Sequence, residues 1–353
     1  MMGDKQSKLR LAINGFGRIG RNVLRAFIKR ADEFDDIEII AINDVADFEL
    51  LLHLLKFDST HGRLSSLGVQ ATIIHQEDKT FLSLSKDDKY WRILLLNQAN
   101  PSQLPWLDLG IDVALECTGK FRSYLDAAHH LTSGAGQVIV GAAPFDSVDA
   151  SIVMGVNDDL LSRDLPIISS VSCTTQALAP LLFVLNERFG IDGVMMTEIH
   201  AVTADQNVLD QNHRDLRRAR AASHNIIPTT SSSISATERV LPFLKGKVNG
   251  HSIRVPTINV AAIDVNIAFG QSVNVEMVAD FLRQVSQDSL VGIMGYTDEP
   301  LVSSDFVGDS HSLVIDGGQI MQANGQIKVF AWYDNEWGYA NRLLDMCLAL
   351  TRC

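Results

Sequence analysis

The chain has few cysteines, and their arrangement predicts neither a metal site nor a disulfide framework. Its four cysteines, Cys117, Cys173, Cys347 and Cys353, are far apart, with no CxxC pair and no histidine at a metal-ligand interval. Zinc sites and small disulfide scaffolds place their cysteines in close, recognisable patterns. The sequence therefore predicts free thiols and no bound metal.

The chain also lacks a long apolar run and an excess of basic residues. It contains no stretch of about 18 apolar residues, the length that a membrane-spanning helix needs. Thirty Lys and Arg against 42 Asp and Glu give a net charge of −12, which disfavours binding to nucleic acid or to an acidic membrane. The first expected strand begins within about ten residues of the start, which leaves no room for a signal peptide. We expect a cytoplasmic protein that binds neither nucleic acid nor a membrane.

The hydrophobic pattern predicts two domains in these 353 residues. Residues 9–13 read as a strand, 15–20 as a tight turn and 37–42 as a second strand, and between them Val23, Leu24, Phe27 and Ile28 form one apolar face of a helix. This order opens a Rossmann-type doubly wound parallel sheet, which the apolar runs 113–115, 138–140 and 152–154 extend. We expect this α/β domain to span residues 1–172 and to be completed by a C-terminal helix within 337–353.

The pattern changes in residues 173–336, which predict an α+β domain with a largely antiparallel sheet. Val194, Met196, Glu198 and His200 share one side of an alternating strand, and residues 252–267 predict a single long strand. Between them, residues 203–235 form a polar segment with little periodicity. Loops of that length in compact domains are usually functional.

A glycine-rich turn follows the first strand and opens the first helix, as in dinucleotide-binding domains. It has the pattern G-x-G-x-x-G and comprises Gly15, Phe16, Gly17, Arg18, Ile19 and Gly20. Its glycines permit the turn, the approach of a pyrophosphate and close helix packing, while the helix N-terminus offers N–H groups. Asp44, at the end of the second strand, is placed to accept from ribose hydroxyls and to repel a 2′-phosphate. The combination predicts NAD as the cofactor; the alternative is an ordinary glycine turn.

Cys173 and His200 are the candidate nucleophile and base. Cys173 lies between a buried strand and an expected helix over 175–185, where a helix N-terminus favours the thiolate. His200 ends the alternating strand, where a half-buried imidazole could pair with the thiol. A structural cysteine and a hydrogen-bonded core histidine are the alternatives. Arg254, amid apolar strand residues, needs an anionic partner and suggests a phosphorylated substrate.

Motifs along the whole chain resemble the glyceraldehyde-3-phosphate dehydrogenase family. They include INGFGRIGRNVLRAF, SCTT, HAVTADQ, DLRRARAA, RVPTINV, GYTDEPLVSSDFVGD and WYDNEWGYANR. The related erythrose-4-phosphate dehydrogenases share this scaffold, and RVPTINVAAID and QLPWLDLG are similar to theirs. The resemblance implies NAD-dependent oxidation of a small phosphorylated aldehyde through a thioester on Cys173, in a homotetramer.

The resemblance also implies roles for further residues. Thr118 and Asn335 would contact the nicotinamide part of NAD. Thr203 and Arg254 would bind the phosphate of the substrate. The attacking inorganic phosphate would meet Ser172, Thr174 and Arg218, together with the phosphate-binding turn that contains Ser231 and Ser232.

The substrate and the last chemical step are left open by the sequence. Ser232 stands where the family usually has glycine, so a position that needs positive φ would be strained and phosphorolysis slowed. Thr203 favours glyceraldehyde 3-phosphate, because erythrose enzymes commonly lack this threonine. Phosphorolysis of a glyceraldehyde 3-phosphate thioester is the leading hypothesis. Hydrolysis with erythrose 4-phosphate, giving 4-phosphoerythronate, is the alternative, and a non-catalytic NAD-binding paralogue is a remote one.

Overall fold

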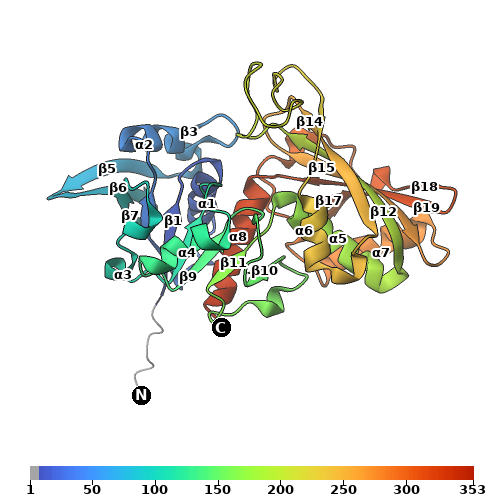
Figure 1. Cartoon of the computed structure of the whole chain (residues 1–353), viewed down its shortest axis with the longest axis horizontal. Helices are drawn as coiled ribbons and strands as arrows, with labels where there is room; N and C mark the ends of the chain where they lie inside the picture. Colours follow the sequence, from blue (N-terminus) through green and yellow to red (C-terminus); the bar gives the residue numbers. More distant parts are fainter. Residues whose placement is uncertain (1–7) are drawn as a thin grey trace. The chain divides into compact units, whose positions relative to one another are not determined.

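A computed structural model describes residues 8–353 of the chain in two compact units (Figure 1). The first unit comprises the described residues up to Ile152, with Asp159–Ser170 and Ala340–Cys353. The second comprises Val153–Asp158 and Val171–Tyr339. The expectation about the opening of the chain concerns a segment that lies mostly outside the described residues.

The first unit is built on a nine-stranded sheet with the order β10-β11-β9-β8-β1-β2-β7-β6-β5. Neighbouring strands from β10 to β7 are parallel, and β5, β6 and β7 pair antiparallel at one end. The strands are β1 (Leu9–Asn14), β2 (Ile37–Asn43), β5 (Gln70–Gln76), β6 (Lys79–Lys86), β7 (Lys89–Leu96), β8 (Val113–Glu116), β9 (Gln137–Val140), β10 (Ala150–Ser151) and β11 (Ile167–Ser169). A short hairpin adds β3 (Phe57–Asp58) and β4 (Gly62–Arg63).

Helices accompany the parallel strands as the alternating pattern predicted. They are α1 (Arg18–Lys29), α2 (Phe48–Lys56), α3 (Trp106–Leu109), α4 (Tyr124–Thr132) and the part of α8 (Trp337–Leu350) that belongs to this unit. Val23, Leu24, Phe27 and Ile28 of α1 are buried, which is the apolar face expected from the 3.6-residue period. The Rossmann-type sheet is therefore confirmed.

The end of the chain joins the first unit through polar contacts to α1. The guanidinium of Arg30 donates to Asn341 Oδ1 at 2.8 Å and to Asp345 Oδ1 at 2.9 Å. Leu343, Leu344 and other apolar residues of α8 are fully buried. The C-terminal helix expected within 337–353 thus exists and spans Trp337–Leu350.

The second unit holds an eight-stranded sheet with the order β13-β14-β12-β15-β19-β17-β16, with β18 paired to β19. Most pairs are antiparallel, while β12–β14 and β16–β17 are parallel. The strands are β12 (Ile191–Ala201), β13 (Ile227–Thr229), β14 (Val248–Val255), β15 (Ala261–Phe269), β16 (Met294–Thr297), β17 (Leu313–Asp316), β18 (Met321–Ala323) and β19 (Gln326–Tyr333). The largely antiparallel α+β architecture is confirmed.

Three helices pack on the second sheet: α5 (Cys173–Phe189), α6 (Ser233–Val240) and α7 (Val275–Gln287) (Figure 1). Apolar residues of α5, β12, β15 and β19 form one buried cluster, so the strand of His200 and the helix of Cys173 share a core. Close packing of this kind holds side chains in defined rotamers.

Two strand expectations are wrong. Residues 252–267 form not one strand but parts of two, β14 and β15, which a turn through Pro256 and Thr257 separates; proline lacks the N–H that a continuing ladder needs. Ile152–Met154 is not a strand either, because β10 ends at Ser151. Ile152–Met154 is apolar because it is buried, and burial alone does not specify a strand.

Candidate active site

The glycine turn of the first unit has the geometry of a dinucleotide site. Gly15 has φ +92°, and a Cβ there would lie 2.6 Å from the Thr118 nitrogen. A Cβ on Gly20 would lie 2.1 Å from the Gly15 oxygen. At Gly17, the N-cap of α1, a Cβ would meet nothing within 4 Å. The first and third glycines are thus required by packing, and the second leaves open space at the helix N-terminus for a pyrophosphate.

Asp44 is fixed beside this turn. Its Oδ2 accepts from the Phe16 nitrogen at 2.7 Å and its Oδ1 from the Ala46 nitrogen at 3.0 Å. The other variable turn residues serve the fold: Ile19 is half-buried on α1, and Arg18 forms an ion pair with Asp58. The Asp44 carboxylate therefore lies directly after β2, next to the helix N-terminus that would bind the pyrophosphate.

Thr118 is held by a buried network that sequence reasoning missed. Glu116 Oε1 accepts from the Thr118 nitrogen at 2.7 Å and also from its hydroxyl. Glu116 Oε2 lies 2.6 Å from Asn14 Nδ2 and 3.2 Å from His130 Nε2. Trp106 Nε1 donates to His130 Nδ1 at 3.0 Å, so His130 Nε2 carries the hydrogen and donates to Glu116. The only sequence signal was Glu116 two residues before Thr118.

Asn14, Asp44 and Thr118 lie at or just after the carboxyl ends of β1, β2 and β8. These three strands are neighbours in the sheet, with β1 between the others. Open α/β sheets bind their ligands at this edge. The residues present therefore fit NAD, with the glycine turn for the pyrophosphate and a carboxylate for the ribose.

In the second unit, a strained turn places Cys173 at the start of α5. Val171 has φ +50° although its side chain is β-branched and fully buried, and such a conformation is uncommon enough to indicate a local constraint. The Tyr339 hydroxyl donates to the Val171 oxygen at 3.0 Å. Ser172 is the N-cap, and its Oγ accepts from the Thr175 nitrogen at 3.1 Å. Cys173 is thereby the first residue of the helix.

His200 lies beside this sulfur. Its Nε2 is 3.6 Å from Cys173 Sγ, and its Nδ1 is 2.7 Å from the Ala201 oxygen. A carbonyl oxygen can only accept, and this contact is shorter than the 3.2 Å between Nδ1 and the guanidinium of Arg254, so Nδ1 carries the hydrogen and Nε2 presents a lone pair to the thiol. Arg254 Nη1 lies 3.2 Å from the same Nδ1 and places a positive charge there. This is the geometry of a thiol with its general base.

Burial keeps both groups of the pair uncharged. Desolvation, with the charge of Glu198 adding to it, raises the pKa of the Cys173 thiol to about 12. Desolvation, followed by the charge of Arg254, lowers the pKa of His200 to about 4. Desolvation thus opposes the effect of the helix N-terminus, which was expected to favour the thiolate. With both groups uncharged at rest, the thiolate forms as the proton passes to Nε2.

Three of the residues expected to bind phosphate lie on β14 and in the loop that follows β12: Arg254, Thr203 and Arg218. Arg254 makes no ion pair among the described residues, and its buried Nε has no hydrogen-bond partner there. Thr203 is half-buried, three positions after His200. Arg218 is engaged, since it binds Asp205 Oδ2 at 2.6 Å and Thr229 Oγ1 at 2.9 Å. Arg254 is therefore the guanidinium best placed to take an anion.

The serine turn is unstrained. Ser232 is the N-cap of α6 with φ −80°, so the expected strain at this former glycine position is absent. Ser231 Oγ lies 2.6 Å from Ser233 Oγ. The substitution of glycine by Ser232 gives no structural reason for slow phosphorolysis.

Two further predicted residues of the candidate site are Asn335 and Thr174. Asn335 is buried, and its Oδ1 has no hydrogen-bond partner among the described residues. An orphaned amide oxygen of this kind suits a ligand N–H group. The Thr174 hydroxyl is already used, because it lies 2.5 Å from Glu198 Oε1 and 2.8 Å from Tyr333 Oη. Sequence reasoning did not single out Glu198 or Tyr333, although strand alternation placed Glu198 on the side of His200.

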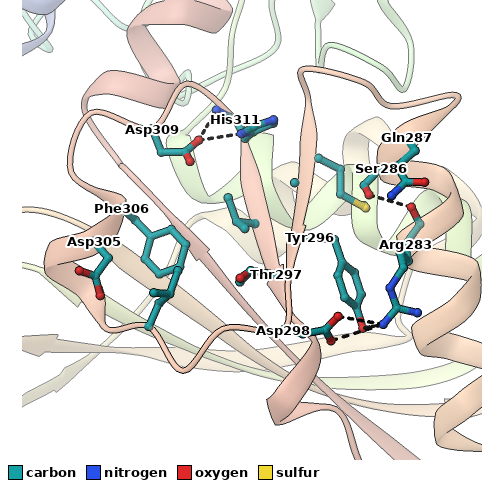
Figure 2. A pocket seen from close by; sticks show the side chains of 14 residues that line it. Arg283, Ser286, Gln287, Tyr296, Thr297, Asp298, Asp305, Phe306, Asp309 and His311 are labelled. Carbon is teal, nitrogen blue, oxygen red and sulfur yellow. Dashed lines mark hydrogen bonds and ion pairs between the residues drawn. The ribbon is translucent and has the colours of Figure 1, made fainter.

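A pocket of about 600 Å³ lies elsewhere in the second unit, between α7, β16 and the loop that leads into β17 (Figure 2). Figure 2 shows Arg283 turned toward Asp298, with which it pairs at 3.1 Å, and His311 beside Asp309 at 2.8 Å. The guanidinium of Arg283 is thus neutralised by a carboxylate of the same pocket. None of the expected catalytic residues lines it, so it is separate from the candidate active site.

Within residues 8–353, no helix combines the length and apolar character needed to cross a membrane. In the same part of the chain, no group of three or more His, Cys, Asp or Glu residues is arranged to hold a metal ion.

A doubly wound sheet with a dinucleotide turn, together with a cysteine paired to a histidine, defines an NAD-dependent dehydrogenase that acts through a thiol. Residues 9–124 match the NAD binding domain of glyceraldehyde 3-phosphate dehydrogenase, and residues 172–335 match its C-terminal domain. The glyceraldehyde-3-phosphate dehydrogenase of Priestia megaterium is 44% identical over 96% of this chain and 97% of its own. That of Mycolicibacterium smegmatis is 45% identical over 96% and 97%. The chain belongs to the glyceraldehyde-3-phosphate dehydrogenase family.

Proposed function

We propose that this enzyme oxidises glyceraldehyde 3-phosphate with NAD and inorganic phosphate, through a thioester on Cys173. The observation that carries this proposal is the 3.6 Å contact between Cys173 Sγ and the unprotonated Nε2 of His200. Relatives that are 42–45% identical over nearly the whole chain bear the name glyceraldehyde-3-phosphate dehydrogenase, which supports the choice of substrate.

The chain's residues would hold NAD along the carboxyl edge of the first sheet. The backbone of residues 15–20 would bind the pyrophosphate and Asp44 the ribose hydroxyls, while Thr118 and Asn335 would contact the nicotinamide part. When bound, NAD supplies the acceptor for the hydride of the substrate. The unpartnered Oδ1 of Asn335 supports its role, because a carboxamide offers the N–H that this oxygen lacks.

In this reaction His200 accepts a proton twice, first from the thiol and later from the hemithioacetal hydroxyl, and each time passes it on. As Cys173 Sγ bonds to the aldehyde carbon, the thiol proton passes to His200 Nε2 and then to the aldehyde oxygen, which the Cys173 N–H helps to hold. His200 next removes the proton of the hemithioacetal hydroxyl while the carbon gives up its hydride to the acceptor, which leaves a thioester on Cys173. Phosphate oxygen then attacks the acyl carbon, and the sulfur leaves and recovers its proton from His200.

Two groups of residues would bind the two phosphates. Arg254 and Thr203 would hold the phosphate of the substrate, which the absence of any ion pair at Arg254 among the described residues supports. The remaining group would receive inorganic phosphate and comprises Ser172, Thr174, Arg218, Ser231 and Ser232. The Thr174 hydroxyl is bound to Glu198, so this residue would offer its backbone N–H.

The domain roles, assembly and location are part of the same proposal. We assign NAD binding to residues 1–172 completed by 337–353, and catalysis to 173–336. Domain matches over 9–124 and 172–335 support this division. A cytoplasmic homotetramer in which the polar segments 203–235 form subunit contacts is the assembly that family membership favours.

The test compares glyceraldehyde 3-phosphate with erythrose 4-phosphate, each with and without inorganic phosphate, by NADH absorbance. We expect rapid, phosphate-dependent reduction of NAD with the triose. Phosphate-independent oxidation of the tetrose at a higher kcat/KM would overturn the proposal and establish the erythrose enzyme.

A further inference from the structure

A buried glutamate occupies the centre of the active site, and the proposed reaction assigns it no role. Glu198 lies on β12 two residues before His200, so the two side chains project from the same face of the strand. Its relative exposure is only 3%. Glutamate is almost never buried without a partner, because a carboxylate loses its hydration there. Its presence beside the reactive sulfur therefore needs an explanation.

A chain of hydroxyl groups fixes one oxygen of this carboxylate. Thr174 has a single hydroxyl hydrogen, and its Oγ1 donates to Glu198 Oε1 at 2.5 Å. The Tyr333 hydroxyl, 2.8 Å from Thr174 Oγ1, must then be the donor in that contact. Tyr333 is itself 2% exposed. The chain Tyr333 to Thr174 to Glu198 thus ends on a charged acceptor, which strengthens both bonds.

The carboxylate is ionised despite its burial. Burial acts to raise the pKa of Glu198, but the charge that His200 carries when protonated, the charge of Arg254 and the hydroxyls of Ser231 and Thr174 outweigh it, and the pKa is lowered. Oε1 lies 3.9 Å from His200 Nε2, whereas Oε2 makes no hydrogen bond among the described residues.

Few other charges face this pair. Arg254 approaches His200 from β14, Cys173 from α5 and Tyr333 from β19, and Arg218 acts on His200 from the loop after β12. On the remaining neighbour, β15, the residue in register with Glu198 is the apolar Ile263. Glu198 is therefore the only carboxylate among these surrounding groups that can balance a proton on the imidazole.

We propose that Glu198 is a positioning residue that stabilises the proton on His200 Nε2 whenever the base removes it from the thiol or from the hemithioacetal. The geometry supports this directly, since Nε2 lies 3.6 Å from Cys173 Sγ and 3.9 Å from Glu198 Oε1. Without Glu198, the imidazolium that forms would face only the positive charges of Arg254 and Arg218, which repel it. The same negative charge disfavours the thiolate at rest, so the sulfur ionises only as its proton passes to His200 Nε2.

Removing the charge of Glu198 is expected to change two rates in opposite directions: alkylation of Cys173 and oxidation of the aldehyde. Without a nearby anion, the pKa of the Cys173 thiol and that of the His200 imidazole both fall, each by about one pH unit or more. At a fixed pH below the thiol pKa, alkylation of Cys173 becomes about tenfold faster for each pH unit by which the thiol pKa falls. Oxidation of the aldehyde becomes slower, because the imidazolium is less stable. A purely structural role would lower both rates together.

The experiment measures alkylation of Cys173 by iodoacetamide and kcat/KM for the aldehyde, both across pH, in Glu198→Gln. Glu198→Asp restores the charge, and Asp264→Asn is the matched control, because Asp264 is a carboxylate of the adjoining β15 in register with Thr197 on the opposite face. We expect faster alkylation, slower turnover and an acid limb at lower pH in Glu198→Gln alone, with Glu198→Asp close to the wild type. Unchanged pKa values in Glu198→Gln, or equal effects of Gln and Asp, would overturn the proposal.

The turnover part of this test rests on the proposed function, whereas the alkylation part does not. If the wild type fails to oxidise the aldehyde but Glu198→Gln still shows the lowered thiol pKa, the proposed function fails and the electrostatic role of Glu198 stands. If the wild type oxidises the aldehyde normally and the thiol pKa is unchanged in Glu198→Gln, the proposed function stands and the electrostatic role of Glu198 fails. Circular dichroism measures separately whether the unfolding temperature of Glu198→Gln changes. If Glu198→Gln does not fold, Glu198→Asp is compared with the wild type instead, because it keeps the negative charge and changes its position.

Discussion

Cys173 Sγ and His200 Nε2 lie 3.6 Å apart, and both belong to the second compact unit. The first residue of α5 and the penultimate residue of β12 are brought together by the core that the helix and the strand share. The reactive pair is therefore formed within one unit, and its geometry rests on close packing rather than on a flexible loop.

Replacing the nucleophile should abolish oxidation without affecting NAD binding. In Cys173→Ser, we expect no acyl-enzyme by mass spectrometry after mixing with substrate and NAD, because a serine hydroxyl ionises far less readily than a thiol. NAD titrations should be unchanged, since the glycine turn lies in the other unit. Cys353→Ser, at an exposed position, is the control and should retain full activity. An acyl-enzyme in Cys173→Ser would place the nucleophile elsewhere.

Replacing the base should change the dependence of the rate on pH. In His200→Gln, we expect kcat/KM to fall by about 10²–10⁴-fold near neutral pH, the usual contribution of a general base. The remaining rate should rise steadily with pH, because a thiol with a pKa of about 12 now ionises only by loss of its proton to solvent. In the wild type, activity should fall only as the pH approaches the His200 pKa of about 4 and the imidazole becomes protonated. A variant with the wild-type profile would exclude His200 as the base.

Removing the guanidinium of Arg254 should impair recognition of the substrate phosphate. In Arg254→Leu, we expect kcat/KM for the phosphorylated aldehyde to fall by about 10–100-fold, the effect of losing hydrogen bonds to a charged group. Oxidation of unphosphorylated glyceraldehyde should be reduced much less, because it lacks the anion. Steady-state kinetics with both aldehydes separate the two effects. An equal loss with both would show that Arg254 acts through His200 and not through the phosphate.

The second and third glycines of the turn should behave differently when each is replaced by alanine. Gly17→Ala places a methyl in open space at φ −73°, so the unfolding temperature should not change while the affinity for NAD falls. Gly20→Ala brings a methyl to 2.1 Å from the Gly15 oxygen and should lower the unfolding temperature as well. Calorimetry and NAD titration provide the two measurements. Full NAD affinity in Gly17→Ala would mean that the dinucleotide does not approach this helix.

The ion pair of Asp58 with Arg18 should stabilise the first unit in a pH-dependent way. Two backbone N–H groups and Arg18, acting against burial, lower the pKa of Asp58 from 3.8 to about 2. The folded pKa is below the unfolded one, so the stabilisation is present above about pH 4 and is lost as the pH falls toward 2. Asp58→Asn should therefore cost about 2 kcal/mol at neutral pH.

Urea unfolding of Asp58→Asn and of the wild type across pH 2–7 would measure this difference. The two stability curves should converge at the acid end of the range. A constant difference at all pH values would contradict an electrostatic origin.

Much of the fold could be predicted because local patterns and tertiary structure agree. The strand before Gly15, the turn itself and α1 form one continuous signal, and the alternation around His200 matches β12. The antiparallel pairing of β5, β6 and β7 was missed, and residues 252–267 were wrongly joined, although both features carry local signals. Two-residue turns join β5 to β6 and β6 to β7, and Pro256 interrupts the long run.

The sequence by itself determined which side chains are available for chemistry: a glycine turn, an aspartate after β2, one cysteine before a helix and one histidine ending a strand. Only the tertiary structure decided their charge states and partners. Desolvation in a shared core, an effect that no local sequence pattern carries, keeps Cys173 a thiol and His200 neutral. The same folding places Glu198 within 3.9 Å of the imidazole, since the distance between side chains on different elements is set by packing and not by their spacing in the chain.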